Sequence, residues 1–302
     1  MATQSSALST EATGARWTPE EYAARFRYSK NLREIVTESG SDCTVYRDFL
    51  ASHDVEVQAI PASRISVERA TVLALGMTSG VKHRLLTLGH FLTQKNASTR
   101  CVVVVDRDYD EMCGVESTHV FMTDWHSVEM YAYNADAIAR LAKFVGGQRE
   151  ANGVEIIRGI EPAVTWLGAA RTALAPHGAG LLENWLSYLD VNSLPVSVRE
   201  RELIGRSVAG NQSADVELIL AEAGRRVSDE TEPVIALVRG HDFTAALKAV
   251  LTSRWARQEG IKMPKMDLDQ FEGTLLMSLT PDRLRTFPLF QALLKRFSKV
   301  SS

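Results

Sequence analysis

Three aspartates alternate along the chain directly after a run of apolar residues. Asp106, Asp108 and Asp110 follow residues 101–105, which are a cysteine and four valines. From Asp106 to Asp136 there are eight acidic side chains and one basic one, a local charge of −7, whereas the whole chain carries −3. Crowded carboxylates repel one another, so a bound cation is the least costly way to keep them ionised together. Oxygen ligands favour a hard ion, and the segment therefore predicts a Mg²⁺ or Mn²⁺ site.

These carboxylates need a scaffold, and the surrounding pattern predicts an α/β fold with a mostly parallel sheet flanked by helices. Short apolar or alternating stretches indicate four strands, at residues 31–37, 55–60, 101–105 and 119–122. Helical patterns lie between them, as expected of parallel strands joined by right-handed crossovers. In such sheets functional side chains gather beyond the carboxyl ends of the strands. One rim is therefore expected to carry the acids that follow the strands: Glu38, Asp106, Asp108 and Asp124.

Capping residues predict where several helices begin. Thr18 with Pro19 and Glu21 is typical of a capping box at a helix start. After the first strand, Gly40 permits a tight turn, and Ser41 or Asp42 is expected to cap the next helix. Further helical patterns cover residues 67–75 and 81–94.

The pattern changes after about residue 134, where the chain becomes mainly helical. We expect residues 1–16 to be a disordered tail, residues 17–134 to form the metal-binding domain, and residues 135–302 to form a helical C-terminal elaboration. The apolar run at residues 233–238 could return one strand to the sheet. Residues 254–299 carry nine Lys or Arg against five acids, which fits either a phosphate-binding face or a solvated helix surface.

Composition places the chain among ordinary globular proteins. It is 45% hydrophobic and 24% charged over 302 residues, and its three cysteines form no CxxC pair. No stretch approaches the roughly 20 apolar residues of a membrane helix, and residues 1–16 lack the apolar core of a secretory signal. The expected location is the cytoplasm, without membrane association.

Four short segments together resemble a known family. They are Thr37-Glu38-Ser-Gly-Ser-Asp42, Val-Val-Asp106-Arg-Asp108-Tyr-Asp110, Thr123-Asp124-Trp-His-Ser-Val-Glu129 and Arg239-Gly240-His241-Asp242. They resemble a TOPRIM domain and, more narrowly, the TOPRIM family that includes the AriB effector of PARIS antiphage systems and is related to OLD-type nucleases. One departure is clear, because the family's usual Val-Glu-Gly reads Thr37-Glu38-Ser39 here, with the glycine delayed to Gly40.

The resemblance implies a hydrolase, a Mg²⁺-dependent nuclease that cleaves phosphodiester bonds and acts in antiviral defence. Carboxylate-held Mg²⁺ can neutralise the phosphate, activate the attacking water and stabilise the leaving oxygen. Glu38, Asp106 and Asp108 are the expected catalytic and metal-binding residues. Glu38 is either a ligand or the general base, and Asp110 is expected in the outer shell or at a second metal. On an extended segment, Asp106 and Asp108 would project to the same side and share an ion.

Three further acids are assigned to the surroundings of this site: Asp42, Asp124 and Glu129. For Asp124 the favoured interpretation is a helix cap, the commoner use of aspartate at such a position. Glu129 either faces the metal or lies at the positive end of a helix.

The acidic run has structural rivals. An EF-hand loop would need Gly and Glu where the chain has Glu111 and Ser117, so it is excluded. A haloacid-dehalogenase-type phosphatase also carries Asp-x-Asp after a strand, but Tyr109, Asp110 and the upstream unit ending in Glu38 argue against it. A solvated acidic loop without function is the third alternative.

The family resemblance also suggests partners. They are a nucleic acid, either RNA such as transfer RNA or DNA, an ATPase that holds the nuclease inactive until infection, and a second copy of the chain. The competing interpretation is a non-catalytic TOPRIM-like module whose acidic rim docks a partner ATPase.

Overall fold

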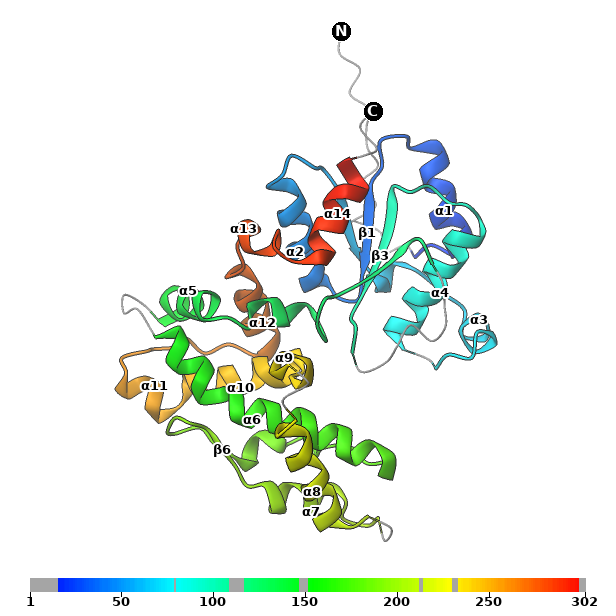
Figure 1. Cartoon of the computed structure of the whole chain (residues 1–302). Helices are drawn as coiled ribbons and strands as arrows, with labels where there is room; N and C mark the ends of the chain where they lie inside the picture. Colours follow the sequence, from blue (N-terminus) through cyan, green and yellow to red (C-terminus); the bar gives the residue numbers. More distant parts are fainter. Residues whose placement is uncertain are drawn as a thin grey trace. The chain divides into compact units, whose positions relative to one another are not determined.

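The computed structural model describes residues 16–78, 80–108, 117–146, 152–211, 214–229 and 233–298, which form two compact units (Figure 1). The sheet unit comprises the described residues from 16 to 106, 117–123 and 285–298. The helical unit comprises residues 107–108 and the described part of 124–284. The change of unit therefore comes earlier than the predicted boundary at residue 134, and the C-terminal helix belongs with the N-terminal sheet.

The sheet unit is built on four parallel strands in the order β2-β1-β3-β4. The strands are β1 (Glu34–Thr37), β2 (Gln58–Pro61), β3 (Cys101–Val105) and β4 (Val120–Met122). Every residue of β1 and β3 is buried, as expected of interior strands whose two faces are covered. The predicted α/β class, parallel sheet and extent of β3 are thus confirmed.

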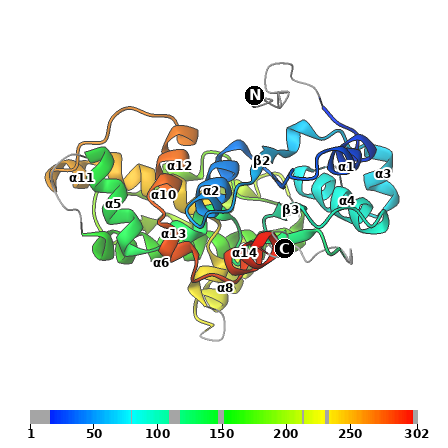
Figure 2. The same ribbon diagram turned by 90° about the horizontal axis from the view of Figure 1, so that it is seen from above.

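Helices cover both faces of this sheet. The unit contains α1 (Pro19–Tyr28), α2 (Gly40–Ala51), η2 (Ala62–Arg64), α3 (Arg69–Ala74), α4 (Val81–Gln94) and α14 (Pro288–Ser298). Figures 1 and 2 both show α1 and α4 on one side of the strands and α2 with α14 on the other. Val103 and Val105 pack in one core with Leu85 and Leu88 of α4, while Val102 and Val104 are also buried.

The first two helices begin where side chains satisfy their amide groups. Thr18 and Glu21 form the predicted capping box of α1. At α2, the prediction that Ser41 or Asp42 is the cap is wrong, because Ser39 is the N-cap and Asp42 completes its capping box. Ser39 has ordinary extended backbone (φ −126°), so this turn does not require the family's glycine at that position.

The helical unit is organised around α6 (Gly153–Leu174), most of whose residues are buried. Its other elements are η3 (Val128–Ala132), α5 (Ala135–Gly146), η4 (Ala175–His177), η5 (Trp185–Tyr188), β5 (Leu189–Asp190), β6 (Ser197–Val198), α7 (Glu200–Ser207), α8 (Val216–Val227), α9 (Val234–Leu237), α10 (Gly240–Thr252), α11 (Arg254–Gln258), α12 (Leu268–Met277) and α13 (Pro281–Leu284). Trp166 and Trp185 are buried in its core, and Trp125 and Trp255 pack against it.

The prediction of a strand at residues 233–238 is wrong, because Val234–Leu237 forms the short helix α9. A brief apolar run fits one buried helical turn as well as a strand, and only neighbouring contacts decide between them. Asp242 lies in the first turn of α10, and its carboxylate forms a bidentate ion pair with Arg171 of α6 (2.7 and 2.8 Å).

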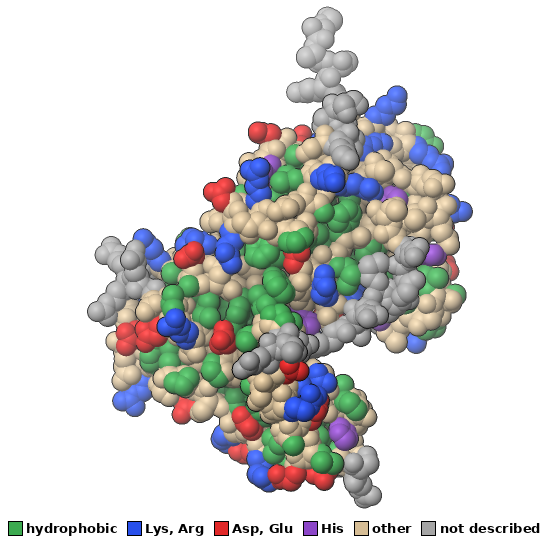
Figure 3. Space-filling model, viewed as in Figure 1, with side chains coloured by type: hydrophobic (Ala, Val, Ile, Leu, Met, Phe, Trp, Pro, Cys, Tyr) green, Lys and Arg blue, Asp and Glu red, His purple; other side chains and the backbone are tan. Residues whose placement is uncertain are grey.

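The surface of the helical unit carries both signs of charge. On the face drawn in Figure 3, acidic and basic side chains are interspersed over this unit. No helix in the described ranges is both long and apolar enough to cross a membrane.

Candidate metal-binding sites

Two acids predicted to share a metal meet at the end of the sheet. Glu38 follows β1 and Asp106 follows β3, and these strands are adjacent and parallel. Oε1 of Glu38 accepts a hydrogen bond from the backbone N–H of Asp106 at 3.0 Å. Both residues are half-buried, so each remains partly accessible to solvent. This pair is the part of the predicted acidic rim that the sheet itself brings together.

The local sequence explains why Glu38 lies at the rim. Thr37 ends the strand, and its hydroxyl donates to the carbonyl of Ser39 at 2.8 Å. The chain then turns directly into α2, whose amino end lies two residues beyond Glu38. The positive end of a helix favours nearby anions, which suits a rim of carboxylates.

Asp108 departs from the extended backbone that its spacing suggested. The strand ends at Val105, and Asp108 has a left-handed φ of 47°. Its N–H donates to the carbonyl of His126 at 3.1 Å, within the helical unit. Aspartate tolerates this conformation better than most residues. The alternation of side chains along a strand therefore does not extend to Asp108, and a metal shared with Asp106 stays a prediction.

The remaining predicted acids have different settings. Asp110 lies outside the described residues. Asp42 accepts the N–H of Ser39 at 3.1 Å, which gives it a capping role in α2. Asp124 is not a helix cap. Its carboxylate accepts a hydrogen bond from the Tyr131 hydroxyl at 2.9 Å, and its backbone N–H donates to the oxygen of that hydroxyl.

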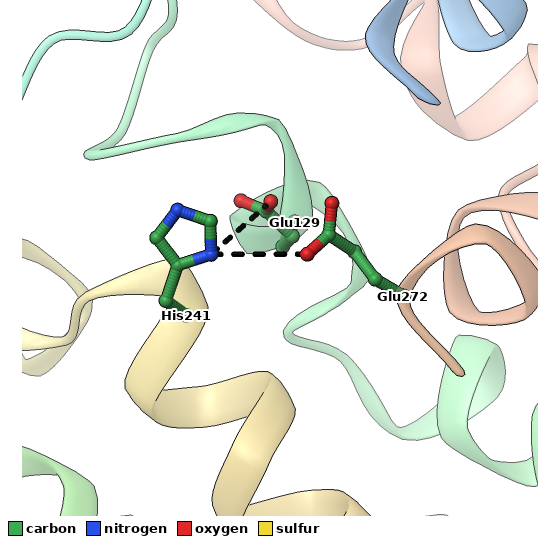
Figure 4. A group of neighbouring side chains, drawn as sticks. All are labelled: Glu129, His241 and Glu272. Carbon is green, nitrogen blue, oxygen red and sulfur yellow. Dashed lines mark ion pairs between the residues drawn. The ribbon is translucent and has the colours of Figure 1, made fainter. Parts of the chain in front are cut away.

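Glu129 belongs to a second group of potential ligands, inside the helical unit. Its carboxylate comes from η3 and faces His241 at the start of α10 and Glu272 of α12 (Figure 4). Nδ1 of His241 lies 3.8 Å from Oε1 of Glu129 and 3.7 Å from Oε2 of Glu272. The three potential ligand atoms lie within 4.8 Å of one another.

The charges in this group influence one another. Burial raises the pKa of the Glu129 carboxyl, while the charge of His241 and the hydroxyl of Ser127 oppose that shift. Glu272, and then Glu129, raise the pKa of His241 to about 9 against the effect of burial. The side chain of His241 is 65% exposed, whereas that of Glu129 is 4% exposed. The two carboxylates therefore stabilise the protonated form of the His241 imidazole.

Sequence reasoning found Glu129 but missed its partners. His241 lies in a segment that resembles the family, yet no spacing linked it to Glu129, more than 100 positions earlier. Glu272 sits in the middle of α12 without any motif around it. Only the packing of η3, α10 and α12 assembles the group.

Comparisons with known proteins identify no family for the chain, so the interpretation of the site rests on its geometry. No model of a known protein family matches the chain, and no curated protein matches it.

Proposed function

We propose that the chain is a Mg²⁺-dependent nuclease of the OLD-like TOPRIM kind, which hydrolyses phosphodiester bonds of RNA or DNA as an effector of antiphage defence. The observation that carries this proposal is the meeting of Glu38 and Asp106 at the ends of two adjacent parallel strands. Ligands and substrates of parallel α/β sheets bind at this end, because the loops there are free to carry functional side chains.

The residues at the rim fit a hard divalent ion. Glu38 and Asp106 offer carboxylate oxygens, which Mg²⁺ prefers. When bound, the ion would neutralise phosphate oxygens and make a bound water more acidic. The hydrogen bond from Asp106 N–H fixes one oxygen of Glu38, which orients the carboxylate for use as a ligand or as the base that accepts the water's proton. Asp108 is proposed as the third acid of this site.

Substrate and partners follow from the family resemblance. We propose RNA such as transfer RNA as a substrate, with DNA as the alternative, and a partner ATPase that restrains the nuclease until infection. A second copy of the chain is a further partner within the same proposal.

A cleavage assay with matched variants tests the activity. Purified protein is incubated with total RNA or DNA in Mg²⁺, Mn²⁺ or EDTA, with and without an ATPase encoded beside it. Metal-dependent cleavage is expected to fall by about 100-fold or more in Glu38→Gln, because loss of an essential catalytic group has effects of this order. Asp48→Asn is the control, since Asp48 is an exposed acid of α2 in the same unit. Equal cleavage by wild type and Glu38→Gln would contradict the proposal.

One observation favours the alternative of a non-catalytic module. The left-handed backbone at Asp108 interrupts the alternation that would let Asp106 and Asp108 share one ion. A rim that only docks a basic partner should tolerate a single neutralisation, because exposed charges each contribute little to binding. Asp108→Asn separates the two functions: it abolishes turnover in a nuclease and leaves partner binding almost unchanged in a docking module.

A further inference from the structure

Three elements of the helical unit converge on one small group of ligand-type side chains. Glu129 reaches it from η3, His241 from the first turn of α10 and Glu272 from α12 (Figure 4). Two ligand atoms held about 2.1 Å from a common ion lie at most about 4.2 Å apart. The distances from His241 Nδ1 to the two carboxylates, 3.8 and 3.7 Å, fall within this limit, and all three potential ligand atoms lie within 4.8 Å of one another.

The buried carboxylate of Glu129 is an independent indication of a ligand. Glu129 is only 3% exposed, and among the described residues no group meets hydrogen-bond geometry with its Oε2 atom, although the Ser127 hydroxyl is close enough to lower the pKa of the carboxyl. Burying a charged oxygen without a partner is costly, so such a group is retained where a cation or proton compensates it. Figure 4 shows this carboxylate directed toward His241 and Glu272.

Gly240 lets the start of α10 come close to this carboxylate. A Cβ atom at Gly240 would lie 1.9 Å from Ser127 Oγ and 2.5 Å from Glu129 Oε2. No side chain fits in that space, so the backbone at the start of α10 lies directly against the side chains of Ser127 and Glu129. The close approach fixes Glu129 beside His241.

We propose that Glu129, His241 and Glu272 form a binding site for a divalent transition-metal ion of the Zn²⁺ type. One imidazole nitrogen with two carboxylate oxygens is a mixed donor set, which suits Zn²⁺ and its first-row neighbours better than Mg²⁺. Three protein ligands leave a further position on the ion. The side chain of His241 is largely exposed, so the group is open to solvent on the side of the imidazole. The site does not depend on the proposed nuclease, because it contains neither Glu38 nor Asp106.

The experiment titrates the full-length, EDTA-treated protein with Zn²⁺ by calorimetry and with Co²⁺ by visible absorption, in a buffer containing millimolar Mg²⁺. We expect one equivalent of Zn²⁺ bound by residues of the helical unit, and a Co²⁺ spectrum typical of mixed nitrogen and oxygen ligands. His241→Gln and Glu272→Gln are each expected to weaken Zn²⁺ binding by at least tenfold, because each removes one of three ligands. Circular dichroism in EDTA checks that both variants remain folded at the temperature and pH of the titration.

Two control variants test whether the ion binds at Glu129, His241 and Glu272 rather than elsewhere. His177→Gln changes a histidine in the same unit whose side chain is outside the group, and it should bind Zn²⁺ as wild type does. Glu38→Gln should also retain this binding. Undiminished binding in His241→Gln, loss of binding in Glu38→Gln, or no saturable binding to wild type would each overturn the proposal. Failure of the nuclease assay would leave this titration unaffected, so the two proposals are tested separately.

Discussion

At the scale of single residues, the chain places its acids in two chemically different settings. Glu38 and Asp106 are half-buried at the end of a sheet and linked by one hydrogen bond. Glu129 is almost completely buried beside an exposed histidine. The first setting suits a hard, partly hydrated ion, and the second suits an ion that accepts a nitrogen ligand. Carboxylates in these two settings are therefore expected to bind different kinds of metal ion.

The charge of His241 should appear in the pH dependence of the metal-free protein. Its pKa is raised to about 9 by Glu272 and Glu129, with Arg239 acting in the opposite direction. Because His241 binds its proton more tightly in the folded than in the unfolded state, protonation stabilises the fold. This stabilisation is fully present below the unfolded pKa of about 6.5 and is lost as the pH rises through 9. In EDTA, the difference in melting temperature between wild type and His241→Gln should therefore shrink between pH 6.5 and 9. A constant difference over this window would show that the imidazole is not stabilised as a cation.

At the scale of elements, helix ends position the candidate site residues. Ser39 caps α2 directly after Glu38, so the same turn ends β1 and begins a helix. In the helical unit, α10 begins at Gly240, where only a glycine allows η3 to approach. The bidentate pair of Asp242 with Arg171 fixes the first turn of α10 to α6. These local arrangements determine where His241 lies.

Adding one methyl group at Gly240 should disturb this junction. Gly240→Ala places a Cβ within 2.5 Å of Glu129 Oε2 and closer still to Ser127 Oγ, so the helix start or the carboxylate must move. We expect destabilisation of about 1–3 kcal/mol by chemical denaturation, typical of overpacked sites. Gly224→Ala is the control, because nothing lies within 4 Å of a Cβ there and α8 is helical. It should be neutral or stabilising by about 0.5–1 kcal/mol, and a similar loss in both variants would contradict the argument.

At the scale of the whole molecule, the C-terminal helix α14 belongs to the same unit as the N-terminal sheet. Phe290 of α14 stacks on Tyr46 at 5.6 Å between ring centroids and makes an edge contact with Phe49 at 4.7 Å. Tyr46 and Phe49 belong to α2, the helix that begins directly after Glu38. The C-terminal helix therefore helps to cover the sheet that carries the proposed nuclease site.

Removing this contact should destabilise the sheet unit strongly. Phe290 is fully buried, so Phe290→Ala is expected to cost about 3–5 kcal/mol of unfolding free energy. Phe144→Ala is the matched control, because Phe144 is 73% exposed and should change stability by no more than about 0.5 kcal/mol. Denaturant unfolding measured by circular dichroism compares the two. Equal effects would show that α14 does not pack on the sheet unit as described.

The sequence alone determined the features that rest on local pattern. Continuous burial of β3, the capping box at Thr18 and the helix at Val81–Gln94 were all predictable, because periodicity and capping act within a few residues. The rim position of Glu38 and Asp106 followed as well, since the carboxyl ends of parallel strands lie together.

Only the tertiary structure decided the features that depend on distant contacts. The apolar run at residues 233–238 became a helix, and Asp108 adopted left-handed backbone beside His126. Glu272 joined Glu129 and His241 without a sequence signal, and α14 returned to the first unit. Each of these outcomes is set by packing between residues far apart in the chain, where many arrangements satisfy the same local pattern and only one buries the side chains together.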